Sequence, residues 1–177
     1  MKKHPIFIII LIASLAVALA FCGTVLAYMF RQTEYIDNEF VPADVSCKVI
    51  EKFDGTQKTS IQVRNTGNID VFLRLRIISY WEDTDGNIVA KPSSMPEINI
   101  NAGWIMGTNN TYYYTKPVSP AAQTGSLLSS PITLDTDEDG NMQVIEIFAE
   151  AIQSKPEDAV TNSWGVTIDS NSYIITP

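Results

Sequence analysis

The fold is decided by residues 70–89, which read DVFLRLRIISYWEDTDGNIV. In an extended strand successive side chains point to opposite faces, so residues two apart share a face. One face of this stretch is apolar and holds Val71, Leu73, Leu75, Ile77 and Trp81. Arg74 and Arg76 fall on the other face, and Asp85-Gly86-Asn87 supplies the turn residues of a β-hairpin. We therefore predict a long, half-buried strand that turns back into a second strand at Ile88 and Val89.

Further β patterns lie on both sides of this stretch. Upstream, Val45, Cys47 and Val49 alternate, as do Thr59, Ile61 and Val63, and a turn follows over residues 64–68. Downstream we expect short strands within residues 97–101, 103–106 and 111–115, a long strand over 142–153 and a last strand over 166–174. A short helix is predicted over residues 156–163, since Pro and acidic residues favour a first helical turn. The fold class is therefore all-β, a jelly-roll-like antiparallel β-sandwich with short helical insertions.

The N-terminus has the pattern of an export signal. Lys2 and Lys3 precede an uncharged, apolar stretch over residues 5–30, and the small-residue site Val25-Leu26-Ala27 predicts cleavage between Ala27 and Tyr28. Residues 6–30 are also long enough to span a bilayer, so the alternative is a retained membrane anchor. Both alternatives place the rest of the chain outside the cytoplasmic membrane, because positive charge stays inside.

Three segments follow from this division. Residues 1–27 are the signal peptide or anchor, residues 28–43 an N-terminal arm, and residues 44–177 the β-sandwich domain. The arm has no clear strand pattern but carries spaced apolar residues that could dock on a neighbouring subunit: Met29, Tyr35, Ile36, Phe40 and Val41. We expect the arm to act as a donor strand.

Charge and composition exclude several functions. After residue 27, ten Lys or Arg stand against twenty Asp or Glu, a net charge of −10, which disfavours nucleic acid and anionic lipid as partners. The only histidine, His4, lies in the signal, so the exported domain lacks the usual zinc ligand and the usual imidazole base. We therefore expect no enzyme activity and no catalytic residues.

One acidic loop matches the spacing of a calcium-binding loop. Residues 135–140 read DTDEDG, and Glu146 follows six residues after Gly140, which fits the D-x-D-x-D-G-x5-E pattern. The candidate ligands are Asp135, Asp137, Asp139, Asn141 and Glu146. The flanking residues resemble strands rather than the helices of an EF-hand, so an acidic hairpin turn is the alternative. Calcium is the only cofactor that the sequence indicates.

Other prominent side chains have structural interpretations. We expect Trp81, Trp104 and Trp164 to be core residues, and Tyr112–Tyr114 to be divided between core and surface. Cys47 is the only cysteine after residue 27, so it is either a buried thiol or a site of pairing between molecules.

Four stretches together resemble the TasA/camelysin-like family of exported Gram-positive proteins. They are the signal end around residues 22–30, the N-T-G turn and strand of residues 65–74, the aromatic segment YYYTKPV of residues 112–118, and AEAIQ at residues 149–153, followed by Trp164-Gly165. Met29-Phe30-Arg31 departs from the acidic-aromatic start usual in that family.

The resemblance implies a jelly-roll domain, release by a dedicated signal peptidase, and extracellular fibres or biofilm matrix built by strand donation between subunits. A non-enzymatic, secreted structural protein that self-associates is therefore our leading expectation. The alternative is a membrane-anchored cell-surface binding module, with or without calcium. A metal-dependent protease, an activity reported within the family, is the weakest alternative, given the composition.

Overall fold

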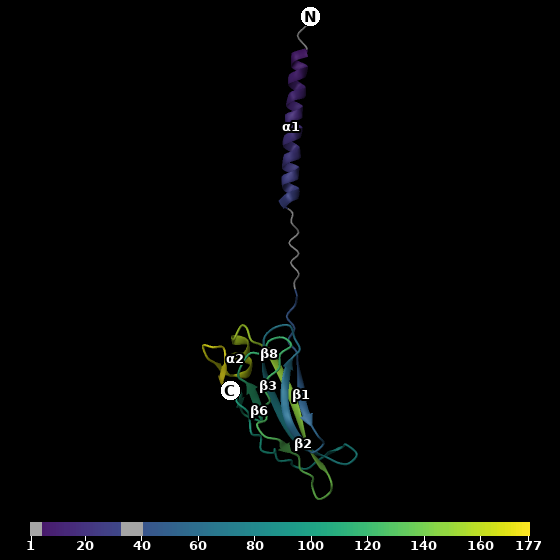
Figure 1. Cartoon of the computed structure of the whole chain (residues 1–177), viewed down its shortest axis with the longest axis vertical. Coiled ribbons are helices and arrows are strands. Elements are labelled where there is room, and N and C mark those ends of the chain that lie inside the picture. Colours follow the sequence, from purple (N-terminus) through teal and green to yellow (C-terminus); the bar gives the residue numbers. More distant parts are fainter. Residues whose placement is uncertain (1–4, 33–40) are drawn as a thin grey trace. The chain divides into compact units, whose positions relative to one another are not determined.

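The computed structural model describes residues 5–32 and 41–177 (Figure 1); for Pro5 and residues 29–32 it describes the backbone only. The chain divides into two units, Met1–Val41 and Pro42–Pro177, which are described separately below.

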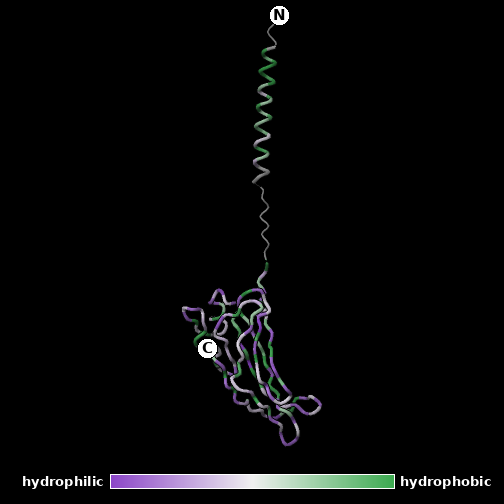
Figure 2. Tube along the Cα trace, viewed as in Figure 1, coloured by the Kyte–Doolittle hydropathy of each residue, from purple (hydrophilic) through white to green (hydrophobic). Residues whose placement is uncertain are grey.

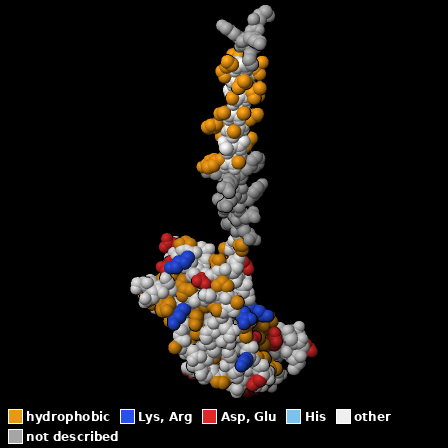
Figure 3. Space-filling model, turned by 45° about the horizontal axis from the view of Figure 1, so that its top comes forward, with side chains coloured by type: hydrophobic (Ala, Val, Ile, Leu, Met, Phe, Trp, Pro, Cys, Tyr) orange, Lys and Arg blue, Asp and Glu red, His pale blue; other side chains and the backbone are white. Residues whose placement is uncertain are grey.

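The N-terminal unit contains one helix, α1 (Pro5–Gln32). Its stretch Ile6–Tyr28 is apolar along its whole length and long enough, at 23 residues, to cross a membrane (Figure 2). Figure 3 shows hydrophobic side chains covering the visible face of this helix. The hydroxyls of Ser14 and Thr24 donate to the carbonyls of Leu11 and Phe21, both at 2.9 Å, so these polar groups are satisfied within the helix, as an apolar environment requires. The helix is consistent with a signal sequence or a membrane anchor.

The second unit is mostly β, with antiparallel sheets. A three-stranded sheet has the order β1-β2-β7 and a two-stranded sheet pairs β9 with β10. A five-stranded sheet has the order β4-β3-β6-β5, with β8 paired to β3. The strands are β1 (Cys47–Phe53), β2 (Gln57–Asn65), β3 (Val71–Glu82), β4 (Ile88–Val89), β5 (Trp104–Met106), β6 (Thr111–Tyr114), β7 (Ile132–Thr133), β8 (Met142–Gln153), β9 (Thr167–Ile168) and β10 (Ile174–Thr176).

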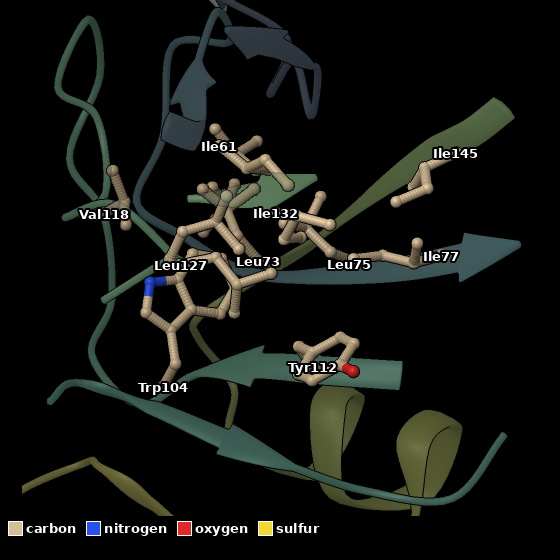
Figure 4. Close-up of a cluster of buried hydrophobic side chains, with 13 residues drawn as sticks. Ile61, Leu73, Leu75, Ile77, Trp104, Tyr112, Val118, Leu127, Ile132 and Ile145 are labelled. Carbon is tan, nitrogen blue, oxygen red and sulfur yellow. The ribbon is translucent and has the colours of Figure 1, made fainter. Parts of the chain in front are cut away.

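The main core lies against the inner face of β3. The predicted apolar face of this strand is buried as expected, and side chains of β2, β5, β6 and β8 pack with it (Figure 4). β3 and β8 pair in register along their whole length, from Val71 opposite Gln153 to Glu82 opposite Met142. The two longest strands predicted from alternation are therefore neighbours, with β8 at an edge of the sheet.

A second, smaller core lies on the other face of β3. Phe72 is fully buried there against Val160 of α2 (Asp158–Trp164) and against Ile174. Arg74 connects α2 to the sheet, because its guanidinium lies 4.7 Å from the centre of the Trp164 ring and 2.6 Å from Glu150 Oε2. The helix thus converts one end of an otherwise solvated sheet face into a packed layer.

Three expected strands differ from the structure. Residues 97–101 form no strand, and only Ile100 makes an isolated bridge, to Leu128. Thr59 is exposed rather than aligned with Ile61 and Val63, because a bulge places it as an extra residue between the pairs Lys52–Ser60 and Phe53–Lys58. The predicted strand over residues 166–174 is a hairpin of β9 and β10. Asp169 Oδ1 accepts the backbone N–H groups of Asn171 and Tyr173, both at 2.9 Å, and this turn interrupts the strand. The structure confirms a mostly β protein with antiparallel sheets and an N-terminal apolar helix, whereas the jelly-roll-like sandwich stays a prediction.

Candidate functional site

The strands β1 and β8 each have one edge without a strand partner among the described residues. β1 pairs with β2 only, and β8 pairs with β3 only. The two strands lie beside each other, with Cα atoms that approach within 8 Å (Figure 1). We call this place, where two unpaired edges adjoin, the β1–β8 seam.

Backbone polarity shows which groups face the seam. The backbone N–H of Gln143 points away from β3 and donates to the Asp135 carbonyl at 2.8 Å. Because the N–H groups of an antiparallel strand alternate between its two edges, those of Ile145, Ile147, Ala149 and Ala151 also point away from β3. On β1, the Ser46 carbonyl accepts the backbone N–H of Thr66 on the β2 side. By the same alternation, the backbone groups of Cys47, Val49 and Glu51 face the seam. An unpaired row of N–H and C=O groups is a template for pairing with another chain.

A cavity of about 370 Å³ opens between the two strands and is lined by Val49, Glu51, Val144–Ile147, Lys58 and Tyr80. Lys58 is buried, its Nζ lies 2.6 Å from Glu51 Oε2 and 4.9 Å from the centre of the Phe53 ring. The burial of Lys58 is not apparent from the sequence, because the bulge at Thr59 reverses the alternation of inward and outward positions in β2.

Cys47 begins β1 at one end of the seam. Its thiol is free and half-buried, and its pKa is raised first by burial and then by the carboxylate of Glu150. A raised pKa keeps the sulfur in the thiol form, which is a poor nucleophile.

The chain enters the domain at a fixed point next to β1. Asn68 binds this entry twice, with Oδ1 accepting the Asp44 N–H at 2.7 Å and Nδ2 donating to the Pro42 carbonyl at 2.9 Å. A Cβ on Gly67 would lie 2.2 Å from the Asp44 carbonyl oxygen, so glycine is required here. The motif of residues 65–68 therefore fixes the position of Pro42 and Asp44, where the predicted arm joins the domain.

The arm itself lies mostly outside the described side chains. Met29 is described as helix backbone only, and Tyr35, Ile36 and Phe40 lie outside the described residues; Val41 is 67% exposed. The predicted cleavage residues, Ala27 and Tyr28, lie in α1, which continues to Gln32.

The acidic loop forms a compact hairpin turn. Asp137 Oδ1 accepts the backbone N–H groups of Asp139 (2.9 Å) and Asn141 (2.8 Å), and Gly140 has a φ of +83°. The turn at Asp83-Thr84-Asp85-Gly86-Asn87 has the same sequence pattern and the same bonds, with a Gly86 φ of +82°. This D-x-D-G-N geometry accounts for Asp137, Asp139 and Asn141 by turn chemistry alone.

The candidate calcium ligands do not gather around one point. Glu146 is exposed in β8 opposite Ile78, and no group of three or more Asp, Glu, His or Cys in the described part of the chain has the arrangement of a metal site. Asp137 Oδ2 lies 2.8 Å from Lys91 Nζ, and this bond to Lys91 is the first cause that lowers the pKa of the Asp137 carboxyl far below its usual range.

The remaining prominent side chains are structural. Trp81, Trp104, Tyr112 and Tyr113 are buried, and Trp164 packs against the second core. They serve as packing residues, as expected for the tryptophans.

Comparisons of the chain with protein-family models, with curated proteins and with solved structures give no match. The class of protein is therefore defined by the structure itself: an antiparallel β-sheet domain preceded by an apolar helix.

The Asp137 turn yields a prediction about pH and stability. A carboxyl whose pKa is lowered by folding stabilises the native state above its unfolded pKa of about 3.9, and this contribution is lost as the pH falls below that value. Asp137→Asn removes the charge that pairs with Lys91, so we expect a lower melting temperature at neutral pH and a shrinking difference from wild type below about pH 4. Asp83→Asn is the matched control, because no lysine pairs with Asp83 among the described residues.

The same melting curves test calcium. If the loop binds calcium, adding millimolar calcium raises the melting temperature of the wild type, and Asp137→Asn abolishes that rise. A turn without a cation gives equal curves in calcium and in chelator.

A loss of stability in Asp83→Asn as large as in Asp137→Asn would contradict the role given to Lys91.

Proposed function

We propose that this protein is an exported structural subunit that self-associates into surface or matrix fibres. In this proposal residues 28–43 of one subunit pair with the β1–β8 seam of the next. The unpaired edges of β1 and β8 are the observation that carries it, because exposed strand edges pair readily with added strands. The resemblance to the TasA/camelysin-like family adds the jelly-roll arrangement and the Gram-positive matrix setting.

The seam has the chemistry that a donated strand needs. Backbone groups of Ile145, Ile147, Ala149 and Ala151 offer main-chain hydrogen bonds, and apolar side chains beside them offer contacts to alternate residues of the arm. A strand placed between β1 and β8 requires a separation of two strand spacings, about 9.6 Å. Since Cα atoms of β1 and β8 lie within 8 Å of each other without a ladder between the strands, the edges must part to admit a strand, and no strand pairing is broken.

The contact would be heterologous, because the arm and the seam are different surfaces of the subunit. Heterologous contacts that do not close into a ring extend without limit. The arm joins the domain at Pro42 and Asp44, both of which are hydrogen-bonded to Asn68, so its point of attachment is fixed. The exported chain lacks histidine, so the proposal includes no catalytic step.

A membrane-anchored binding module is the second candidate. The continuity of α1 beyond Ala27 to Gln32 favours it, because an uninterrupted apolar helix of this length suits a permanent span. In that case residues 28–43 connect the span to the domain and are not free to be donated.

Export separates the two candidates. We expect protein released into the culture medium to begin at Tyr28, since Ala27 is the last residue of the small-residue site recognised by a signal peptidase. Intact-mass measurement of the secreted protein should show the loss of residues 1–27. Finding full-length chain in the membrane fraction alone would favour the anchored module and contradict the fibre proposal.

Assembly is tested at both of its surfaces. A mature form lacking residues 28–43 should remain a folded monomer, because the described core lies in Pro42–Pro177. Ala149→Pro should also abolish fibres, since it removes an N–H that faces the seam and leaves the β3–β8 ladder intact. Ala149→Ser keeps that N–H and is the matched control.

Electron microscopy and light scattering report the outcome, and circular dichroism checks that each variant is folded. Fibres formed by the shortened protein, or by folded Ala149→Pro as readily as by Ala149→Ser, would overturn the proposal.

A further inference from the structure

A second gap in strand pairing lies on the opposite edge of β3. β6 pairs with β3 as far as Arg76, opposite Thr111, and β4 begins to pair at Trp81, opposite Val89. Between these points a pocket of about 360 Å³ adjoins β3. It is lined by Arg76–Ser79 of the strand, by Ser93 and Met95, and by Asn109 and Asn110.

The backbone of β3 is open in this gap. Val71 and Ile77 direct their N–H groups away from β8, to the carbonyls of Val118 (3.1 Å) and Asn110 (3.0 Å). By the alternation of the strand, Ser79 points the same way. No hydrogen bond from the described residues reaches the backbone N–H or C=O of Ser79. The pocket therefore has a strand edge as its floor, with one donor and one acceptor available.

Arg76 gives the pocket its charge. Its side chain is exposed, and none of the described residues forms an ion pair or hydrogen bond with its guanidinium, in contrast to Arg74, which pairs with Glu150. No carboxylate lines the pocket. On a chain with a net charge of −8, this is a local cationic site with its donors free.

A buried polar network supplies a further donor. The amide Nε2 of Gln143, which is 2% exposed, lies 2.7 Å from the Ser94 carbonyl and 3.2 Å from both Ser79 Oγ and Ser93 Oγ. The two hydroxyls are 2.6 Å apart. The network contains four hydrogens, two on the Gln143 amide and two on the serine hydroxyls. It uses three of them, in the bonds from the amide to Ser94 and to a serine and in the bond between the two serines, so one serine hydroxyl hydrogen is left over. Ser79 and Ser93 both line the pocket, so this hydrogen is available to a bound acceptor.

Asn109 and Asn110 form the remaining wall. Both adopt left-handed backbone conformations, with φ of 54° and 53°, as the two central residues of the tight turn between β5 and β6 require. Their side-chain amides make no hydrogen bond with other described residues. They add donors and acceptors to the lining of the pocket.

We propose that this pocket binds a short extended peptide that ends in a carboxylate. The peptide backbone pairs with Ser79 across the gap in the sheet, and the carboxylate lies at the guanidinium of Arg76. The open strand edge favours a peptide over other anions, because its donor and acceptor match those of a strand. The free guanidinium favours a carboxylate, to which arginine donates two parallel bonds. This site is separate from the β1–β8 seam and does not depend on fibre assembly.

The test uses the full chain, labelled with ¹⁵N, in detergent micelles. Trialanine with a free carboxylate is titrated, followed by trialanine amide, which lacks the charge. We expect amide-resonance shifts at Ser79, Ser93 and Asn110, and binding of the acid at least about tenfold tighter than that of the amide, since hydrogen bonds to charged groups are the stronger ones.

Two variants sharpen the result. Arg76→Gln should remove the preference for the acid and leave amide binding unchanged, whereas Arg64→Gln, at an exposed arginine of β2, should change neither. Asn110→Gly keeps the left-handed backbone and removes the side-chain amide, and it should weaken both ligands.

Three outcomes of the trialanine titrations overturn the proposal. They are the absence of shifts at these residues, equal binding of acid and amide, and equal effects of Arg76→Gln and Arg64→Gln. Galacturonate serves as an anion without a peptide backbone. If it binds as tightly as trialanine, the site recognises anions in general and the peptide assignment is wrong.

Discussion

The continuous pairing of β3 with β8 is the interaction on which the rest of the structure depends. Twelve residues of each strand pair without a register shift, and the inner face of β3 carries the apolar side chains of the main core. Because β8 uses one edge for β3, its other edge remains open at the seam. Because β6 and β4 each cover only part of the other edge of β3, a gap is left between them. Both proposed binding surfaces therefore result from one long ladder whose neighbours are shorter.

Two turns capped by side chains and two basic residues connect outlying parts of the domain to the sheet. Asp83 and Asp137 organise identical turns, and Lys91 joins the second turn to the ring of Trp81, which lies 5.2 Å from its Nζ. Arg74 performs a similar task at the other end of the sheet, where it links Glu150, Trp164 and Tyr113. These four residues lie on β3, β6, β8 and α2, so their contacts join the helix to the sheet.

The sequence predicted the local structure well and the pairing poorly. Long alternating runs identified β3 and β8, because a strand places apolar residues at every second position on one face, where they can all be buried together. The D-G-N sequences identified two turns. Phe72 was missed, since it lies on the face assigned to solvent and is buried only because α2 returns to cover it. The buried position of Lys58 depends on a bulge, and the seam and the Ser79 gap depend on which strands meet. Such features follow from long-range pairing, which alternation along one strand does not report.

The central claim is that the open edge of β8 receives a strand from another subunit. Hydrogen exchange at single amides tests it most directly, because an amide is protected when its N–H is paired in a sheet. We predict that the N–H groups of Ile145, Ile147, Ala149 and Ala151 exchange rapidly in the monomer and become protected in the assembled fibre, while Val144 and Glu146, paired to β3, are protected in both. Equal exchange at the four seam amides before and after assembly would contradict the account.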